Sequence, residues 1–187
     1  MQILCFSDLY QIEKVPTIDC DLVVLLGNVS KKVIREIEII YQEQPIVGLL
    51  SNTCAPDTYA GTQVIDIHEK VVEIDGIRFS GYGGVPSHGD SRKGYYTEKQ
   101  CKDFIDKLAV SDVDVLLSYS NPAYGDLKGN DSKDGFKAYN EIFINKLTKY
   151  LIHGRLHQNL KRTLAKVNIH IVYEHQLITI KELKGGN

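Results

Sequence analysis

Five short apolar runs, each followed at once by a polar or glycine-containing turn, constrain the fold of this 187-residue chain most strongly. The runs occupy residues 3–6, 22–26, 46–50, 113–117 and 151–152. Uninterrupted Leu, Ile and Val runs are typical of parallel strands that are buried on both faces. Parallel strands end at one edge of a sheet, and open α/β sheets bind their ligands at that edge. The polar residues after the five runs are therefore expected to form the functional site.

Helix and hairpin signals lie between and after these runs. Ser30 and Thr97 are predicted N-caps of two helices, because apolar residues recur at helical spacing after each of them. The dipeptide Asp75-Gly76 joins two apolar segments within 71–84, which predicts a hairpin. The remaining predicted elements are a third helix over 136–147 and a closing hairpin built from 167–172 and 177–180 around Glu174-His175.

Composition and charge exclude several classes of protein. The formal net charge of −2 gives no global attraction to nucleic acid or to a membrane surface. No apolar run approaches the roughly 20 residues of a membrane helix, and the first strand leaves no room for a signal peptide. The four cysteines, at positions 5, 20, 54 and 101, show no paired spacing, which predicts reduced thiols and a cytoplasmic location. We expect a single domain over 1–183 and a flexible tail over 184–187.

The order of the polar turns resembles that of the metallophosphoesterase (calcineurin-like phosphoesterase) superfamily over nearly the whole chain. Ser7-Asp8-Leu9-Tyr10, Leu26-Gly27-Asn28 and Ser51-Asn52-Thr53-Cys54 stand where that family has Asp-x-His, Gly-Asp and Gly-Asn-His. Ser118-Tyr119-Ser120-Asn121-Pro122 and Gly154-Arg155-Leu156-His157 stand at its later His-containing and Gly-His-x-His segments. The hairpin at 71–84 resembles the family's connecting hairpin. The resemblance implies an α/β fold, a four-layer αββα sandwich of two mixed sheets flanked by helices.

The resemblance assigns a role to each motif position, and most positions depart from the family pattern. The retained metal-ligand positions are Asp8, Asn52 and His157. The altered positions, which we expect to line the pocket, are Tyr10, Tyr119 and Arg155 in place of histidine ligands, Asn28 in place of the bridging aspartate, and Thr53 in place of the histidine that protonates the leaving group. No catalytic residue is therefore assigned.

The altered set suits two metal ions poorly. Two divalent ions bring four positive charges, whereas these positions offer one carboxylate, Asp8, and a permanent cation, Arg155. The neutral amide of Asn28 cannot bridge two cations, and a protonated tyrosine is a poor ligand. We therefore expect no cofactor, and we hypothesise that Arg155 fills the place of the second metal and pairs with Asp8. An active enzyme would need a divalent metal such as manganese.

Three functions fit these residues. The first is a pseudoenzyme that binds a protein or a phosphate-bearing ligand, with Arg155 contacting the phosphate. The second is a metal-dependent phosphoesterase or phosphodiesterase with a reduced metal site, for which His88 and Asp90 are candidate replacement ligands. The third is a structural partner of a larger assembly. The substrate or partner is not readable from the sequence.

Each site residue also has a purely structural interpretation. The alternatives are a loop cap for Asp8, a turn residue for Asn52, a hydrogen-bonded remnant for His157, space-filling rings for Tyr10 and Tyr119, and a solvated loop for His88 and Asp90.

Overall fold

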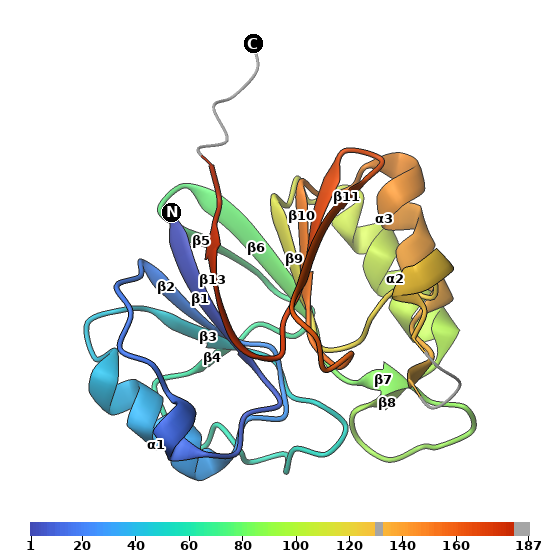
Figure 1. Cartoon of the computed structure of the whole chain (residues 1–187). Helices are drawn as coiled ribbons and strands as arrows, with labels where there is room; N and C mark the ends of the chain where they lie inside the picture. The colour runs from blue at the N-terminus through green and yellow to red at the C-terminus, as the bar shows by residue number, and fades with distance from the viewer. Residues whose placement is uncertain (130–132, 182–187) are drawn as a thin grey trace.

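The computed structural model describes residues 1–129 and 133–181, which form two large sheets and one two-stranded ribbon (Figure 1). Sheet I has the strand order β13-β1-β2-β3-β4, and sheet II has the order β11-β12-β10-β9-β6-β5. The strands of sheet I are β1 (Gln2–Ser7), β2 (Leu22–Leu25), β3 (Ile46–Gly48), β4 (Ile65–Asp66) and β13 (Glu174–Thr179). Those of sheet II are β5 (Val71–Ile74), β6 (Ile77–Tyr82), β9 (Val115–Ser118), β10 (Tyr150–His153), β11 (Leu160–Leu164) and β12 (Val167–Ile171). The ribbon pairs β7 (Val85–Pro86) with β8 (Tyr95–Tyr96).

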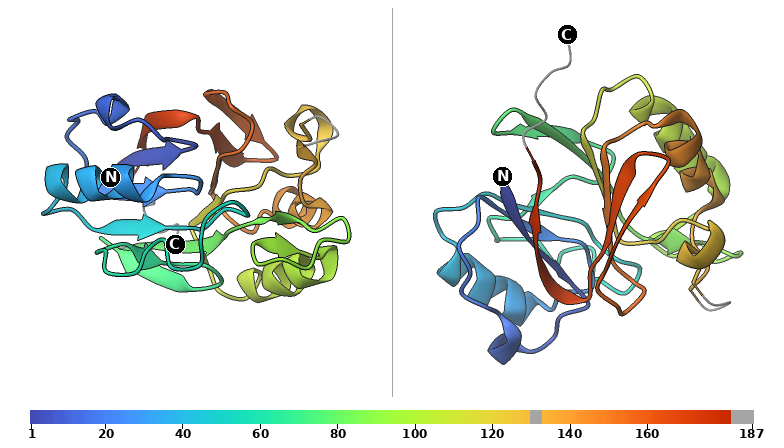
Figure 2. Two further views of the ribbon diagram at one scale, coloured as in Figure 1. Left: turned by 90° about the horizontal axis from the view of Figure 1, so that it is seen from below. Right: turned by 45° about the horizontal axis from the view of Figure 1, so that its top comes forward.

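Helices cover the outer face of each sheet, so the molecule has four layers in the order α-β-β-α (Figures 1 and 2). The helices are α1 (Lys31–Ile40), α2 (Glu98–Leu108) and α3 (Asn140–Asn145), with 3-10 turns η1 (Ile12–Lys14), η2 (Gly125–Leu127) and η4 (Lys137–Tyr139). Helix α1 packs on sheet I, and α2 and α3 pack on sheet II. The sandwich of two mixed sheets predicted from the sequence is confirmed.

Strand alternation divides the buried apolar residues among three cores. In β1, Ile3 and Cys5 face the core between the sheets, whereas Leu4 and Phe6 face α1. All four side chains are fully buried. Because successive side chains of a strand point to opposite faces, a strand that is covered on both faces reads as a continuous apolar run.

Parallel pairing places the ends of the central strands at one edge of the sandwich. Strands β1 to β4 are parallel to one another, and so are β6, β9, β10 and β12. The antiparallel strands are β13, β11 and β5, which lie at sheet edges. The carboxyl ends of the parallel strands of both sheets reach the lower side of the view in Figure 1.

Local sequence signals produce the predicted elements. The Ser30 hydroxyl accepts the backbone N–H three residues on, at the start of α1. Thr97 and Gln100 form a capping box at the start of α2, in which each side chain accepts the other residue's backbone N–H. The turn at Asp75-Gly76 has both φ angles positive, 48° and 73°, as a tight β5–β6 hairpin requires. These signals depend on short-range geometry, which is why the sequence reveals them.

The predicted closing hairpin is wrong. Strand β12 lies in sheet II and β13 in sheet I, so the segment around Glu174-His175 crosses between sheets instead of turning a hairpin. The hairpin partner of β12 is β11, and the turn is made by Ala165 and Lys166 with φ of 50° and 73°. Strand β11 gave no apolar signal because residues 161–163, at its centre, are exposed polar side chains.

The predicted third helix is shorter than expected. Residues 136–147 contain the 3-10 turn η4 and the short helix α3, which ends at Lys146 in a left-handed conformation with φ of 52°. A left-handed residue at this position ends the helical hydrogen-bond ladder.

The sequence also makes predictions about the cysteines, membrane-spanning helices and the C-terminal tail. All four cysteines are free thiols. Within the described ranges, no helix combines the length and apolarity needed to cross a bilayer. The predicted tail at 184–187 lies outside the described residues.

Leu117 provides a test of the core between the sheets. The side chain is fully buried in β9, so Leu117→Ala is expected to lower the free energy of unfolding by about 2–5 kcal/mol, measured by chemical denaturation. Ile144→Ala is a truncation of equal size at a side chain that is 71% exposed, and it should change stability by less than about 0.5 kcal/mol. Equal losses would contradict the described layer arrangement.

Candidate functional site

The carboxylate of Asp8, at the end of β1, is the centre of the strand-end cluster. The residue is only 6% exposed. Its Oδ1 accepts a hydrogen bond from Asn28 Nδ2 at 2.7 Å and one from the Tyr119 hydroxyl at 3.3 Å. Its Oδ2 accepts one from the Ser7 hydroxyl at 2.9 Å. Donors from the ends of β1, β2 and β9 therefore surround one buried acceptor.

Asn28 is held at both ends of its amide. Its NH2 group donates to Asp8, and its Oδ1 accepts a hydrogen bond from Thr53 Oγ1 at 2.6 Å. The Thr53 hydroxyl also lies 3.0 Å from Ser51 Oγ. This chain of contacts assigns the amide orientation, with the nitrogen toward Asp8. Thr53 and Asn28 thus belong to the cluster, as predicted from their motif positions.

The backbone at the site is unusual in four non-glycine residues. Asp8, Asn28, Arg155 and His157 have φ of 55°, 58°, 69° and 50°, all in the left-handed region. Left-handed backbone costs roughly 1–2 kcal/mol for a residue with a Cβ, although Asn, Asp and His adopt it more readily than most. Such strain gathers at functional sites because surrounding contacts must hold it in place.

Two glycines permit the strand ends to approach one another. A Cβ at Gly154 would lie 2.1 Å from Ser7 Oγ, and one at Gly27 would lie 2.9 Å from the Tyr119 ring. Gly27 also has φ of 123°. The glycine after β10 therefore brings the loop of sheet II against the end of β1 in sheet I.

His157 lies beside Asp8 at the surface of the cluster. Its Nε2 is 3.8 Å from Asp8 Oδ1, and its side chain is 51% exposed. The imidazole packs against the ring of Tyr173, with ring centroids 5.1 Å apart. Of the three retained positions, the structure brings these two together.

Asn52, the third retained position, has a different partner. Its Nδ2 donates to the Tyr95 hydroxyl at 2.8 Å. Neither Asp8 nor His157 has a hydrogen bond to Asn52 among the contacts of the described residues. The backbone of Gly94 packs against Asn52, since a Cβ at that glycine would lie 2.6 Å from the Asn52 Cα. The Tyr95 hydroxyl and the Gly94 backbone thus fix the position of Asn52.

The hypothesis that Arg155 pairs with Asp8 is wrong. Arg155 Nη1 donates to Ser120 Oγ at 3.0 Å and to the Asp134 carbonyl at 2.8 Å. No Arg155–Asp8 ion pair occurs in the part of the chain that the structure describes. Burial lowers the pKa of Arg155, and Tyr119 and Asp134 oppose this shift more strongly than Asp8 does. The guanidinium therefore braces the loop before Phe136.

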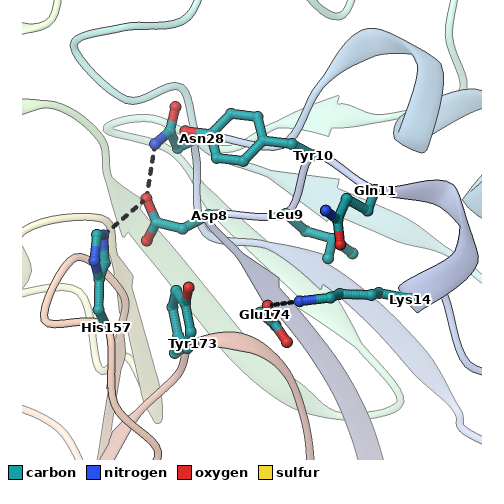
Figure 3. A pocket seen from close by; sticks show the side chains of 9 residues that line it. All are labelled: Asp8, Leu9, Tyr10, Gln11, Lys14, Asn28, His157, Tyr173 and Glu174. Carbon is teal, nitrogen blue, oxygen red and sulfur yellow. Dashed lines mark hydrogen bonds and ion pairs between the residues drawn. The ribbon is translucent and has the colours of Figure 1, made fainter.

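A pocket of about 260 Å³ opens beside Asp8 (Figure 3). Besides Asp8, three residues that the sequence assigned to the site line this pocket, namely Tyr10, Asn28 and His157. The other lining residues are Leu9, Gln11, Lys14, Tyr173 and Glu174. The described lining of this pocket does not include Arg155, Tyr119, Thr53 or Asn52. Thr53 borders a second depression of about 190 Å³, which shares Tyr10 and Asn28 with the first.

Sequence reasoning missed five of the lining residues, Leu9, Gln11, Lys14, Tyr173 and Glu174. Lys14 forms an ion pair with Glu174, and the Tyr173 ring packs against the His157 ring at an angle of 30°. Tyr173 and Glu174 lie where the chain crosses from sheet II to sheet I, the segment predicted as a hairpin turn. No pattern in the sequence marks them, because their place depends on which sheet each flanking strand joins.

His88 and Asp90 do not join the cluster. Asp90 is bound by Arg92, which lowers the pKa of this carboxyl through a side-chain hydrogen bond. His88 is exposed and borders a separate pocket near Glu98. The solvated-loop interpretation fits both residues.

Known structures of three proteins resemble this chain. The protein TT1561 of Thermus thermophilus matches with a TM-score of 0.69 and 15% identity, covering 92% of this chain and 89% of its own. Phosphopantetheinyl hydrolase from Mycobacterium tuberculosis has a TM-score of 0.60 and 9% identity, covering 100% and 98%. A putative 5'-nucleotidase from Staphylococcus aureus has a TM-score of 0.55 and 8% identity, covering 91% and 48%.

The chain has the metallophosphoesterase fold. No protein-family model matches its sequence, and no curated protein matches it by sequence. At 15% identity or less, the structural matches establish the fold alone.

The donor groups at the site do not fit the two-metal centre typical of the metallophosphoesterase fold. A bridging carboxylate would stand at position 28, where the Asn28 amide instead directs its NH2 group at Asp8. The Tyr119 hydroxyl also directs its proton at Asp8. Burial and the charge of Asp8 both raise the pKa of Tyr119, so its phenol stays protonated. Within the described residues, no three His, Cys, Asp or Glu side chains converge to hold a metal.

The Tyr119 hydroxyl provides a test of the Asp8 network. Tyr119→Phe removes one donor to a buried carboxylate, so the free energy of unfolding is expected to fall by about 1–2 kcal/mol. Tyr124→Phe is the matched control, because the Tyr124 ring is 41% exposed and its hydroxyl forms no hydrogen bond with the described residues. Equal stability of the two variants in urea would contradict the network.

The burial of His153 can be tested through the pH dependence of stability. Burial lowers the pKa of this fully buried imidazole at the end of β10 to about 4. The unfolded chain, with a histidine pKa of about 6.5, binds the proton more readily, so stability falls as pH drops from about 6.5 to 4. His153→Gln should remove up to about 3 kcal/mol of this pH-dependent loss, measured by urea unfolding at each pH. If the free energy of unfolding changes equally with pH in the wild-type protein and in His153→Gln, the lowered pKa of His153 is contradicted.

Proposed function

We propose that this protein is a single-domain pseudoenzyme of the metallophosphoesterase fold that lacks an intact dimetal centre and acts as a binding module. One observation carries the proposal. Asp8, the carboxylate at the retained motif positions, accepts hydrogen bonds from three neutral donors, Asn28, Tyr119 and Ser7.

The energetics of this network support the proposal. Hydrogen bonds to charged groups contribute about 1.5–3 kcal/mol each, so a metal ion at Asp8 Oδ1 would compete with the contacts from Asn28 and Tyr119. The incoming ion would then meet the NH2 group of Asn28 and the protonated phenol of Tyr119 instead of anionic ligands. Neutral donors thus satisfy the carboxylate that metal ions would neutralise in a dimetal enzyme.

The position of the general acid adds to this argument. Thr53 stands at that position and donates its hydroxyl proton to Asn28. A threonine hydroxyl is too weak an acid to protonate a leaving group efficiently near neutral pH, since general acids work best with a pKa near the operating pH. The residue at the general-acid position therefore does not supply the leaving-group proton.

The alternative is a metal-dependent phosphoesterase or phosphodiesterase with a reduced site. One observation favours it: Asp8 Oδ1 and His157 Nε2 are 3.8 Å apart, which permits both to contact one divalent ion such as manganese. Two fold neighbours are named as a phosphopantetheinyl hydrolase and a putative 5'-nucleotidase. Asn52 donates to Tyr95 through Nδ2, so this contact does not use its amide oxygen, the atom that would bind a metal.

The pocket beside Asp8 bears on which class of ligand the binding module takes. A phosphate-bearing ligand was expected from Arg155, but that guanidinium is directed to Ser120 and Asp134. A protein partner that inserts a side chain into the pocket remains compatible with the proposal. The four free thiols support a cytoplasmic location, which we include in the proposal.

A metal titration tests the proposal. We expect manganese to give no saturable binding heat with the wild-type protein in calorimetry, and no manganese-dependent hydrolysis of bis(4-nitrophenyl) phosphate. Asn28→Asp restores a carboxylate at the bridging position and should produce measurable manganese binding, because a second anion replaces an N–H donor facing Asp8.

The control is Asn145→Asp, a change of the same chemistry at an exposed position of α3, outside the site. It should leave the calorimetric trace unchanged. Tight manganese binding by the wild-type protein, with turnover that disappears in Asp8→Ala, would overturn the proposal in favour of the single-metal enzyme.

A further inference from the structure

The pocket beside Asp8 has aromatic walls and acidic ends. Tyr10 lies on one side, and Tyr173 with the His157 ring lies on the other (Figure 3). Asp8 closes one end, and the Lys14–Glu174 ion pair lies at the opposite end (Figure 3). The Tyr10 side chain is 58% exposed, although large aromatic rings are usually more buried. An exposed ring at the mouth of a pocket is available to contact a ligand.

The charges that face the pocket favour a cation. Its described lining contains two carboxylates, Asp8 and Glu174, against one lysine, Lys14, which is already engaged by Glu174. His157 adds a positive charge only when its imidazole is protonated. The pKa of Lys14 is raised by its hydrogen bond to Glu174, and the pKa of Tyr10 is raised by burial and by the charge of Asp8. Both groups are therefore protonated near neutral pH, so Lys14 is a cation and Tyr10 is neutral there.

The hydrogen-bonding capacity of Asp8 also leaves room for a ligand. Its Oδ1 accepts two hydrogen bonds, whereas its Oδ2 accepts one, from Ser7. An ionised carboxylate has about four acceptor positions. A donor that enters the pocket can therefore bind Asp8 without displacing Asn28 or Tyr119. An anion entering the same space would meet this carboxylate unscreened.

We propose that this pocket binds an organic ammonium ion, a primary amine with an aromatic or apolar body. The ammonium group donates to Asp8 Oδ2, the negative charge of Glu174 at the other end of the pocket attracts the same cation, and the body lies between Tyr10 and Tyr173. Aromatic faces attract cations, and tyrosine rings provide apolar contact at low entropic cost. The inference rests on the proposed function, because a dimetal centre at Asp8 would make the pocket strongly positive.

Three benzyl compounds of similar size separate charge from shape. Benzylamine is cationic at neutral pH, benzyl alcohol is neutral and benzyl phosphate is anionic. Calorimetric or NMR titration of the wild-type protein should give the tightest binding with benzylamine, at least about tenfold tighter than with benzyl alcohol. Benzyl phosphate should bind more weakly than the alcohol. Tighter binding of the phosphate would overturn the inference.

Matched variants assign the binding to this pocket. Glu174→Gln removes one of the two carboxylates and should weaken benzylamine binding by about tenfold while leaving benzyl alcohol binding nearly unchanged. Glu141→Gln is the control, because Glu141 on α3 is also paired with a lysine and has similar side-chain exposure, 32% against 29% for Glu174. An equal loss in both variants, or no loss in Glu174→Gln, would place the amine elsewhere and overturn the inference.

Melting temperatures of both variants check that they are folded. If Glu174→Gln lowers the melting temperature, Tyr10→Leu gives an independent test, since it keeps an apolar side chain at an exposed position and removes the ring. It should weaken benzylamine binding about threefold to tenfold, as expected for a lost cation–π contact. Unchanged benzylamine affinity in Tyr10→Leu would contradict the proposed binding mode.

The manganese titration keeps the two proposals separate. A protein that binds neither manganese nor benzylamine fails this inference and leaves the pseudoenzyme proposal intact. A protein that binds manganese tightly and hydrolyses a phosphodiester fails the pseudoenzyme proposal, and this inference fails with it.

Discussion

The buried carboxylate of Asp8 is the group on which the arrangement of the site depends. A carboxylate that is 6% exposed is costly unless each oxygen has a donor. Here the donors come from three separate strand ends, through Ser7, Asn28 and Tyr119. Gly27 and Gly154 allow the loop of Tyr119 and the loop after β10 to approach the end of β1. The carboxylate therefore ties sheet I to sheet II at the edge where the strands end.

The same network accounts for the contrast between fold and site. The layers, the sheet order and the convergence of strand ends are those of a metallophosphoesterase, yet the groups around Asp8 are neutral donors instead of metal ligands. Folding requires only that Asp8 be satisfied, and hydrogen bonds do this as well as cations can. Asp8, Asn28 and His157 have left-handed backbone, which the contacts of the cluster hold in place. The fold thus persists while the chemistry available at its edge changes.

The elements that the sequence predicts well are those decided by neighbours in the chain. The continuous runs at β1, β2 and β9 report burial on both faces, and the caps at Ser30 and Thr97 report contacts three residues away. The elements it predicts poorly depend on distant partners. Strand β11 has an exposed polar centre, so only its pairing with β12 makes it a strand. The sequence around Glu174 predicts a hairpin because two strands close in sequence usually pair, whereas β12 and β13 join different sheets.

The sequence by itself determined which residues stand at the strand ends, and so placed Asp8, Asn28 and Tyr119 in one cluster. It also determined that their chemistry differs from that of a dimetal site, because residue identity sets charge and donor type. Only the tertiary structure decided the partners of Arg155 and Asn52, and it brought Lys14, Tyr173 and Glu174 to the pocket. The reason is physical: a side chain chooses its partner among groups that are near in space, and those groups come from both sheets.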